Sequence, residues 1–302
     1  MSEPTTVIGL GEVLWDLLPT GKVLGGAPAN FAYMATVLGD RGVVATRIGN
    51  DDLGRDALHL MQEFGLDTSC VQKDETHATG TATVSIDGAG QPKFTIKQFV
   101  AWDYLEWTPA WEELSTHTDV ICFGSLAQRS PTSAATIQRF LKKVPNTALR
   151  VCDVNLRQSF YTRELVRQSL QLAHIVKMNE QELLEVSFLL GLGIGTEEIL
   201  AKRLLREFGL RVVCITRGHR GSLLVAEDKV VEHRGVRVKV ADAVGAGDAF
   251  TACLAHHFVR GRSLEEISEL ANRFAAWVAT QTGATPAISP EQLRDIFSQA
   301  GT

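Results

Sequence analysis

Short apolar runs rich in β-branched residues alternate with longer helical patterns along most of this 302-residue chain. The strand-like runs read TVIGL, GVVATRIG, DVICFGS, LRVCDVN, IVKMN and RVVCITRG. Between them, segments such as ANFAYMATVLG and EEILAKRLLREFG carry apolar residues at the spacing of one helix face. Strands that alternate with helices build a mostly parallel sheet with helices on both faces. The sequence therefore predicts a doubly wound α/β fold, in which ligands bind beyond the carboxyl ends of the strands.

One region, between Thr79 and Gln98, breaks this alternation. There TGTATVSIDGAGQPKFTIKQ alternates apolar and polar residues, turns at 87–90 and alternates again, which predicts a β-hairpin without a following helix. The hairpin is too small to hold its own core, so we expect a single domain over 1–302 with a β lid formed by about 12–26 and 74–104. A lid would exclude water during group transfer. A hairpin used for dimer contacts predicts the same pattern, and both uses are compatible.

Composition argues against several kinds of partner. The net charge is −5 and the basic residues are scattered, so we expect no nucleic-acid partner. No apolar run has the length of a bilayer span and the N-terminal segment lacks signal-peptide features, which predicts a cytoplasmic protein without membrane contact. The five cysteines are isolated and are expected in the core, and the eight histidines show no zinc-ligand spacing.

The stretch DAVGAGDAF, residues 242–250, predicts a loop that enters a helix, because apolar residues then recur at helical spacing. Gly245, Ala246 and Gly247 would sit at the helix N-terminus, where unpaired amides and the helix dipole attract anions. A phosphate could approach the main chain there, with Asp248 beside it as a proton acceptor. A flexible turn followed by an acid that complements the dipole fits the same residues.

Polar residues also follow the other predicted strands. Asp16, Gly26 and Asn30 come after the first strand and could seat a hydroxyl-rich ligand, although Gly-Gly-Ala-Pro is also a good plain turn. An acid, an amide and a guanidinium at 153–157 favour a polar cleft over a surface salt bridge. Asn179 and Glu182 follow the strand IVKM at the start of a helix. They fit a polar site and a plain capping box equally well.

Parallel strands place all these loops, and Thr216 to Gly218, at one edge of the sheet. An anion pocket, a carboxylate and hydroxyl-binding side chains together predict phosphoryl transfer onto an alcohol. The chain has no GxxxxGK[ST] loop, and Gly9-Leu10-Gly11 lacks the third glycine of a dinucleotide fingerprint.

Two of these motifs resemble the signatures of a known family. DAVGAGDAF is similar to the C-terminal signature of the ribokinase-like, or PfkB, carbohydrate kinases, and GGAPANFA with IGNDDLG is similar to their N-terminal signature. The similarity covers nearly the whole chain and implies a ribokinase-like α/β fold with a small β-sheet lid, ATP as phosphate donor and Mg²⁺ as bridging ion. It also implies Asp248 as general base, with Gly245, Ala246 and Gly247 as an anion hole.

The resemblance assigns further roles. Asn179 and Glu182 match the family's NxxE motif, which orders magnesium-bound water and phosphate. Asp16, Gly26 and Asn30 would contact the sugar, with Arg157 near the substrate or the transferred phosphate. The implied nucleotide-binding positions are Thr216, Gly218 and Asn272. The implied ligands of a monovalent cation, K⁺, are Asp242, Val244, Val278, Gln281 and Gly283. Ala287 and Ala243 replace residues common in the family, which leaves K⁺ activation open.

Within the family, GEVLWDLLP, GGAPANFAY and DVNLR are most similar to bacterial fructokinases. We therefore expect D-fructose as substrate, phosphorylated at O6, with ribose, 2-keto-3-deoxygluconate and a nucleoside as alternatives. A catalytically silent sugar-binding regulator and a nicotinamide-dependent enzyme are alternatives of other classes. The hairpin with Phe94, Phe99 and Trp102 nearby also predicts a homodimer surface.

Overall fold

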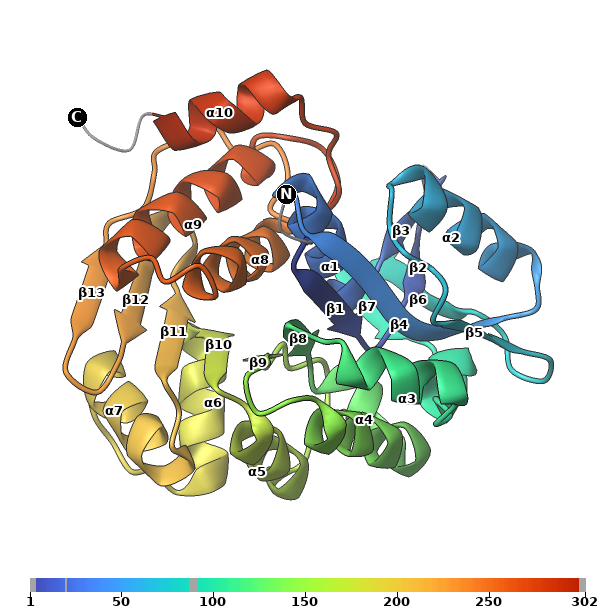
Figure 1. The fold of residues 1–302 in the computed structure, drawn as a ribbon, viewed down its shortest axis with the longest axis horizontal. Coiled ribbons are helices and arrows are strands. Elements are labelled where there is room, and N and C mark those ends of the chain that lie inside the picture. The colour runs from blue at the N-terminus through green and yellow to red at the C-terminus, as the bar shows by residue number, and fades with distance from the viewer. Residues whose placement is uncertain (1–3, 20, 87–91, 299–302) are drawn as a thin grey trace.

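The computed structural model describes residues 4–19, 21–86 and 92–298. Within them, the main sheet has nine strands and is parallel from β5 to β11, while β12 and β13 continue it in antiparallel fashion (Figure 1). In spatial order these strands are β13 (Val230–His233), β12 (Ser222–Val225), β11 (Val212–Thr216), β10 (Ile175–Asn179), β9 (Leu149–Asp153), β8 (Val120–Phe123), β1 (Thr6–Leu10), β4 (Arg41–Gly49) and β5 (Val71–Asp74). The predicted mostly parallel sheet is confirmed.

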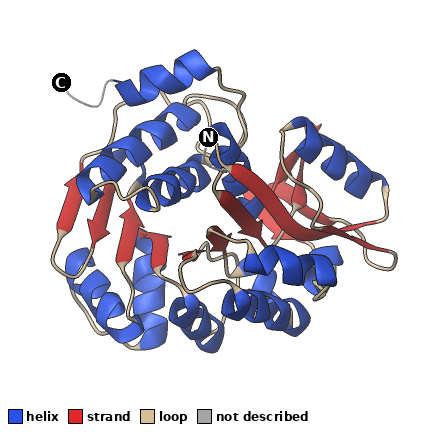
Figure 2. Cartoon of the chain, in the orientation of Figure 1, coloured by secondary structure: helices blue, strands red, loops and turns tan. Residues whose placement is uncertain are grey.

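Helices cover both faces of this sheet (Figure 2). One face packs against α1 (Ala27–Val37), α2 (Asp52–Glu63), α8 (Ala246–Phe258) and α9 (Leu264–Ala279), and α10 (Pro290–Ser298) packs on α9. The other packs against α3 (Pro109–Thr116), α4 (Pro131–Lys143), α5 (Arg163–Leu172), α6 (Glu180–Leu190) and α7 (Glu197–Phe208). Consecutive strand residues face opposite layers, so Val7 enters the first core and Ile8 the second. The doubly wound prediction is therefore confirmed.

A second, smaller sheet contains the predicted hairpin. Its strands, in spatial order, are β3 (Gly21–Gly25), β2 (Leu14–Leu18), β6 (Gly80–Ile86) and β7 (Pro92–Ile96). β6 and β7 pair antiparallel, as predicted, and the expected turn at 87–90 lies outside the described residues. β2 pairs in parallel with β6, so two chain segments separated by α1, β4, α2 and β5 form one small sheet.

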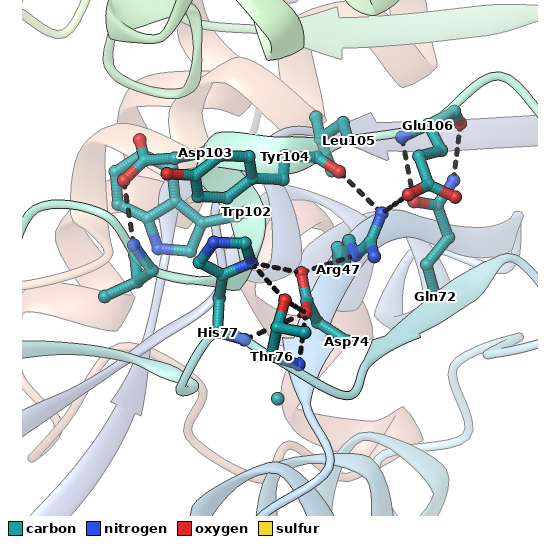
Figure 3. Close-up of polar contacts among 12 residues, drawn as sticks. Arg47, Gln72, Asp74, Thr76, His77, Trp102, Asp103, Tyr104, Leu105 and Glu106 are labelled. Atoms are coloured by element: carbon teal, nitrogen blue, oxygen red, sulfur yellow. Dashed lines mark hydrogen bonds and ion pairs between the residues drawn. The ribbon is translucent and has the colours of Figure 1, made fainter.

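Polar and aromatic contacts fix the base of the small sheet, where 75–79 connects β5 to β6 and 97–106 leads from β7 toward α3 (Figure 3). Asp74 accepts hydrogen bonds from the backbone amides of Thr76 and His77 and forms an ion pair of 2.9 Å with Arg47. The His77 ring stacks on Tyr104, with 3.6 Å between ring centroids. The two connections are thereby held against each other and against the ends of β4 and β5.

The predicted dimer surface is corrected at one residue. Trp102 has no exposed surface, because the short 3₁₀ helix Ala101–Tyr104 turns its ring into the core, where Arg129 stacks on it at 3.9 Å. A buried ring cannot contact a second subunit. Phe99 is 74% exposed, and the side chain of Phe94 lies outside the described residues.

The prediction that the cysteines are core residues is confirmed. All five cysteines are free and buried, as expected for small core residues. The described residues contain no group of three or more His, Cys, Asp or Glu side chains arranged to hold a metal ion. None of the described helices combines the length and apolar character needed to cross a membrane.

Candidate active site

A cavity of about 1720 Å³ lies at the carboxyl ends of the central strands and is bordered by the small sheet. Its volume exceeds the several hundred Å³ typical of a site for one small ligand, so it has room for two. The predicted site residues that line it are Asp16, Gly26, Asn30, Arg157, Asn179, Glu182, Thr216, Gly218, Asp242, Val244, Gly245, Ala246, Gly247, Asp248, Asn272 and Gly283. Val278 and Gln281 do not line it.

The N-terminus of α8 opens into this cavity. Gly245 is its N-cap residue, with a left-handed backbone (φ 79°). No described residue accepts a hydrogen bond from the amides of Gly245, Gly247 or Asp248, and the Ala246 amide makes only a long 3.4 Å bond to the Ala243 carbonyl. Helix amides without partners carry the positive end of the helix dipole. This end of the cavity is therefore suited to an anion.

Two glycines keep this helix end open. A Cβ atom on Gly245 would lie 2.5 Å from the Ala284 carbonyl oxygen, inside van der Waals contact, and the positive φ also disfavours a side chain. A Cβ atom on Gly247 would lie 3.0 Å from Nζ of Lys177. Glycine at both positions lets the main chain face the cavity without obstruction.

Asp248 lies on the first turn of α8 and retains some exposure toward the cavity. Its Oδ2 accepts a 2.8 Å hydrogen bond from Nδ2 of Asn30 on α1. Burial, with the nearby Asp153 carboxylate, raises the pKa of Asp248 to about 6, while the hydrogen bond from Asn30 opposes the shift. A carboxylate with a pKa in this range is a better proton acceptor at neutral pH than an ordinary aspartate.

Lys177 is a cavity residue that the sequence analysis did not identify. It lies in β10, is 8% exposed, and its Nζ is 3.0 Å from Oδ2 of Asp153. The hydroxyl of Thr251 donates to the same oxygen at 3.0 Å. Although burial opposes its charge, the Asp153 carboxylate holds the pKa of Lys177 above its usual range. A lysine inside the apolar run IVKMN was the signal available in the sequence.

The ion pair of Asp153 is buried, so the alternative of a surface salt bridge is wrong. The sequence left open a surface salt bridge, but Asp153 is 4% exposed and its lysine partner is almost as deeply buried. Two charges removed from water in this way are costly unless they are paired and hydrogen-bonded, as they are here. The pair places a fixed positive charge beside Gly247.

The sugar-side candidates come from the small sheet, from its junction with α1 and from the loop after β9. Asp16 lies in β2, where burial raises the pKa of its carboxyl group. Gly26 is the N-cap of α1, with φ 116°. Arg157 is exposed, and its only hydrogen bond within the described chain is a 3.1 Å contact with the Leu156 carbonyl. Its guanidinium group is therefore free to turn toward a ligand.

Asn179 and Glu182 form the capping box that the sequence allowed. The Asn179 side chain accepts from the Glu182 amide at 2.9 Å, and Glu182 Oε2 accepts from the Asn179 amide at 2.8 Å. Glu182 Oε1 also accepts from the Leu156 amide at 3.0 Å, so this carboxylate joins α6 to the loop after β9. Burial raises its pKa. The capping geometry and a position on the cavity wall thus occur together.

The remaining nucleotide-side candidates lie on three elements. Thr216 ends β11, and Gly218 follows it with φ 57°. Asn272 lies in α9 and is 7% exposed, with its Nδ2 donating to Oγ of Ser222 at 2.8 Å. The three lie along the cavity wall.

The predicted cation ligands are only partly brought together. Asp242 accepts the amides of Val244 and Gly283 at 3.0 and 3.1 Å, and these three residues line the cavity. The Val278 carbonyl instead accepts from the Gln281 amide at 2.9 Å in the turn after α9. Asp242 and the neighbouring carbonyl groups offer the oxygen donors that a hard cation takes.

Comparisons with known proteins identify the family of the chain. A family model described as pfkB family carbohydrate kinase matches residues 19–292. A fructokinase from Escherichia coli is 30% identical over 305 residues, covering 94% of this chain and 96% of that protein. A solved fructokinase double mutant from Vibrio cholerae O395, in fructose, ADP and potassium ion bound form, is 25% identical, with a TM-score of 0.80, covering 98% of this chain and 100% of that one.

A structure of aminoimidazole riboside kinase from Salmonella enterica has the same fold, at 23% identity and a TM-score of 0.79, covering 97% of this chain and 99% of that one. The family model includes both the small sheet's β6 and β7 and the N-terminus of α8. The chain therefore belongs to the pfkB family of carbohydrate kinases and is a phosphotransferase with an alcohol group as acceptor.

Proposed function

We propose that this protein transfers the γ-phosphoryl group of ATP to O6 of D-fructose. The observation that carries the proposal is the set of unpaired amides at the start of α8 beside the Asp248 carboxylate. The choice of fructose is supported by the similarity to fructokinases along nearly the whole chain. Ribose, 2-keto-3-deoxygluconate and a nucleoside are the alternative acceptors.

In this proposal Asp248 takes the proton from the attacking hydroxyl group. The hydroxyl oxygen bonds to the γ-phosphorus atom of ATP while the bond from that phosphorus to the bridging oxygen breaks and ADP leaves. Its raised pKa brings the carboxylate closer to the pH at which it works. The hydrogen bond from Asn30 holds the Oδ2 atom, so the carboxylate has a fixed orientation before the substrate arrives. A prepositioned acceptor costs no reorganisation at the moment of reaction.

The amides of Gly245, Gly247 and Asp248 would then donate hydrogen bonds to the oxygen atoms of the transferred group. Negative charge on those oxygens is also close to the buried ammonium group of Lys177. Mg²⁺ would neutralise charge on the nucleotide phosphates, and Asn179 and Glu182 would hold it through water. Asp242, with carbonyl groups of Val244 and Gly283, would hold a K⁺ ion near the helix end.

The small sheet would act as a lid at the sugar end. Its residues Leu14, Ala82 and Ile96 give the cavity an apolar border beside Asp16. Such a border excludes water, which protects the phosphoryl group from hydrolysis. Phe99 would lie in a homodimer contact near this sheet, and sedimentation of the wild type and a Phe99→Ser variant tests this arrangement.

The test is ADP release measured with fructose, ribose, 2-keto-3-deoxygluconate and nucleosides, each with and without K⁺. We expect the highest kcat/KM with fructose, and ³¹P NMR of the product should show a phosphate ester at O6. Faster turnover of another acceptor would contradict the assignment of fructose. Tight sugar binding without ADP release from any acceptor would instead identify a silent binding protein, and tight NADH binding without a response to ATP would reject the kinase.

The pH profile of kcat/KM gives a second prediction. Asp248 must be ionised to accept a proton, and its pKa is about 6. We therefore expect kcat/KM to be level above this pKa and to fall by about tenfold per pH unit below it. Initial rates measured from about pH 5 to about pH 8 test the expectation. A profile that stays level through this range would show that no group with this pKa acts in the free enzyme.

A further inference from the structure

Glu12 lies at the sugar end of the cavity, and the proposed phosphoryl transfer does not use it. It stands between β1 and β2, is 2% exposed, and lines the cavity. Its Oε2 atom is buried and has no hydrogen-bond partner among the described residues. Buried carboxyl oxygens are nearly always hydrogen-bonded, because leaving one unpaired costs its full desolvation energy. A hydrogen-bond donor on a bound ligand would satisfy this unpaired oxygen.

Glu12 lies close to residues that are expected to contact the sugar. The Glu12 carbonyl oxygen lies 2.4 Å from the position of a Cβ atom on Gly26, so the two peptide segments are in direct contact. Gly26 in turn accepts the amide of Asn30 at 3.0 Å, and Asn30 holds Asp248. Glu12 thus stands beside residues from which sugar contacts are expected.

Charge points in the same direction. Burial raises the pKa of Glu12 to about 7, its own backbone amide and Arg157 lower it, and Asp248 raises it further. Glu12 is therefore within electrostatic reach of both the carboxylate proposed as base and the exposed guanidinium group of Arg157. At neutral pH its carboxyl group can accept a hydrogen bond in the ionised form and also donate one when protonated.

A buried cation that affects Glu12, Arg129, is already bound to other groups. Arg129 also affects the pKa of Glu12, but its Nε and Nη2 atoms bind Asp103, each at 2.8 Å, and its guanidinium group stacks on Trp102. The Nη1 atom of Arg129 is buried without a partner, yet no hydrogen bond joins it to Glu12 among the described residues. This leaves the Oε2 acceptor of Glu12 available to a ligand.

We propose that Glu12 determines sugar specificity by hydrogen bonding to a hydroxyl group other than the one that receives the phosphate. The proposal rests on the sugar kinase function above but not on the choice of fructose. Asp248 and the α8 amides engage the reacting hydroxyl, so the carboxyl group of Glu12 is left for another position of the same molecule. A hydroxyl group both fills the unpaired site and rejects analogues that lack it.

The experiment is a cycle that combines Glu12→Ala and Glu12→Gln with a set of monodeoxy forms of the best sugar. In the wild type, one deoxy sugar should lose about 10²-fold in kcat/KM, as a lost hydrogen bond to a buried charged group requires. In Glu12→Ala the deoxy sugar and the parent sugar should have about the same kcat/KM, because the carboxyl group that binds the hydroxyl is gone. The KM for ATP should not change in either variant.

Glu12→Gln keeps the shape and removes the charge, so it preserves the fold if Glu12→Ala does not. It should reduce the penalty for the same deoxy sugar only in part. Glu106→Gln is the control, because Glu106 is an exposed acid that pairs with Arg47 and does not line the cavity. That variant should keep the full wild-type penalty.

Sugar binding measured by calorimetry accompanies turnover, so the two proposals fail separately. A wild type that binds sugars but releases no ADP would reject the proposed function, while the binding data still test Glu12. An undiminished penalty for every deoxy sugar in both Glu12 variants would reject the role of Glu12. Equal losses for all sugars and for ATP would mean that Glu12 only supports the fold, and would reject the role as well.

Discussion

Asp248→Asn should lower kcat by about 10²- to 10⁴-fold, because the variant loses the proton acceptor beside the attacking hydroxyl group. Asparagine keeps the side-chain shape, and its carbonyl oxygen can still accept the hydrogen bond from Asn30. The KM for ATP and the affinity for the sugar should change little. Steady-state rates with the sugar selected by the acceptor panel measure this effect. Turnover close to the wild type would remove Asp248 from the mechanism.

Protein stability provides the control for this variant. The raised pKa means that folded Asp248 holds its proton more tightly than the unfolded chain does, so its ionisation costs stability. That cost begins as the pH rises through the ordinary aspartate range and is complete above about pH 6. At pH 8, therefore, Asp248→Asn should unfold in urea at a concentration no lower than the wild type. A large fall in this midpoint would attribute the lost activity to misfolding.

Gly245→Ala should damage both stability and activity. The added Cβ atom would lie 2.5 Å from the Ala284 carbonyl oxygen, and the residue would have to keep φ near 79°. The clash and the left-handed backbone together should cost about 2–5 kcal/mol in the free energy of unfolding. If the helix end shifts to relieve the clash, its amides lose their alignment, and kcat should fall by at least about 10²-fold.

Gly261→Ala separates the two causes. Gly261 has a similar left-handed backbone, φ 70°, but no atom lies within 4 Å of the position of its Cβ. This variant should show only the backbone cost, about 1–2 kcal/mol, with unchanged kcat. Urea unfolding and steady-state kinetics on both variants make the comparison. Equal effects of the two substitutions would show that the contact with Ala284 is unimportant.

The alternation of strands and helices in the sequence was sufficient to predict the layers of the fold. In β1, Val7 and Ile8 face different cores, and a run apolar at every position is what such a doubly covered strand requires. The hairpin was equally readable, because β6 and β7 alternate around a turn-forming stretch. The parallel pairing of β2 with β6 joins distant segments, and no local pattern records it.

The site was predicted best where its chemistry resides in the backbone and in loops. The glycines before Asp248 indicate an open helix end, and Gly245 and Gly247 serve that purpose in the structure. Lys177 was missed because it lies within a strand, where only the position of its side chain relative to Asp153 reveals the ion pair. Trp102 was misplaced because sequence proximity to the exposed Phe99 does not show which way a short 3₁₀ helix turns a ring.

The junction between β3 and α1 has a mechanical consequence. β3 ends at Gly25, and the next residue, Gly26, is the N-cap of α1. Four residues later, Asn30 donates a hydrogen bond to Asp248. One turn of helix thus separates the end of the small sheet from the side chain that orients the Asp248 carboxylate. The position of the small sheet and the orientation of the base are therefore linked through one short stretch of backbone.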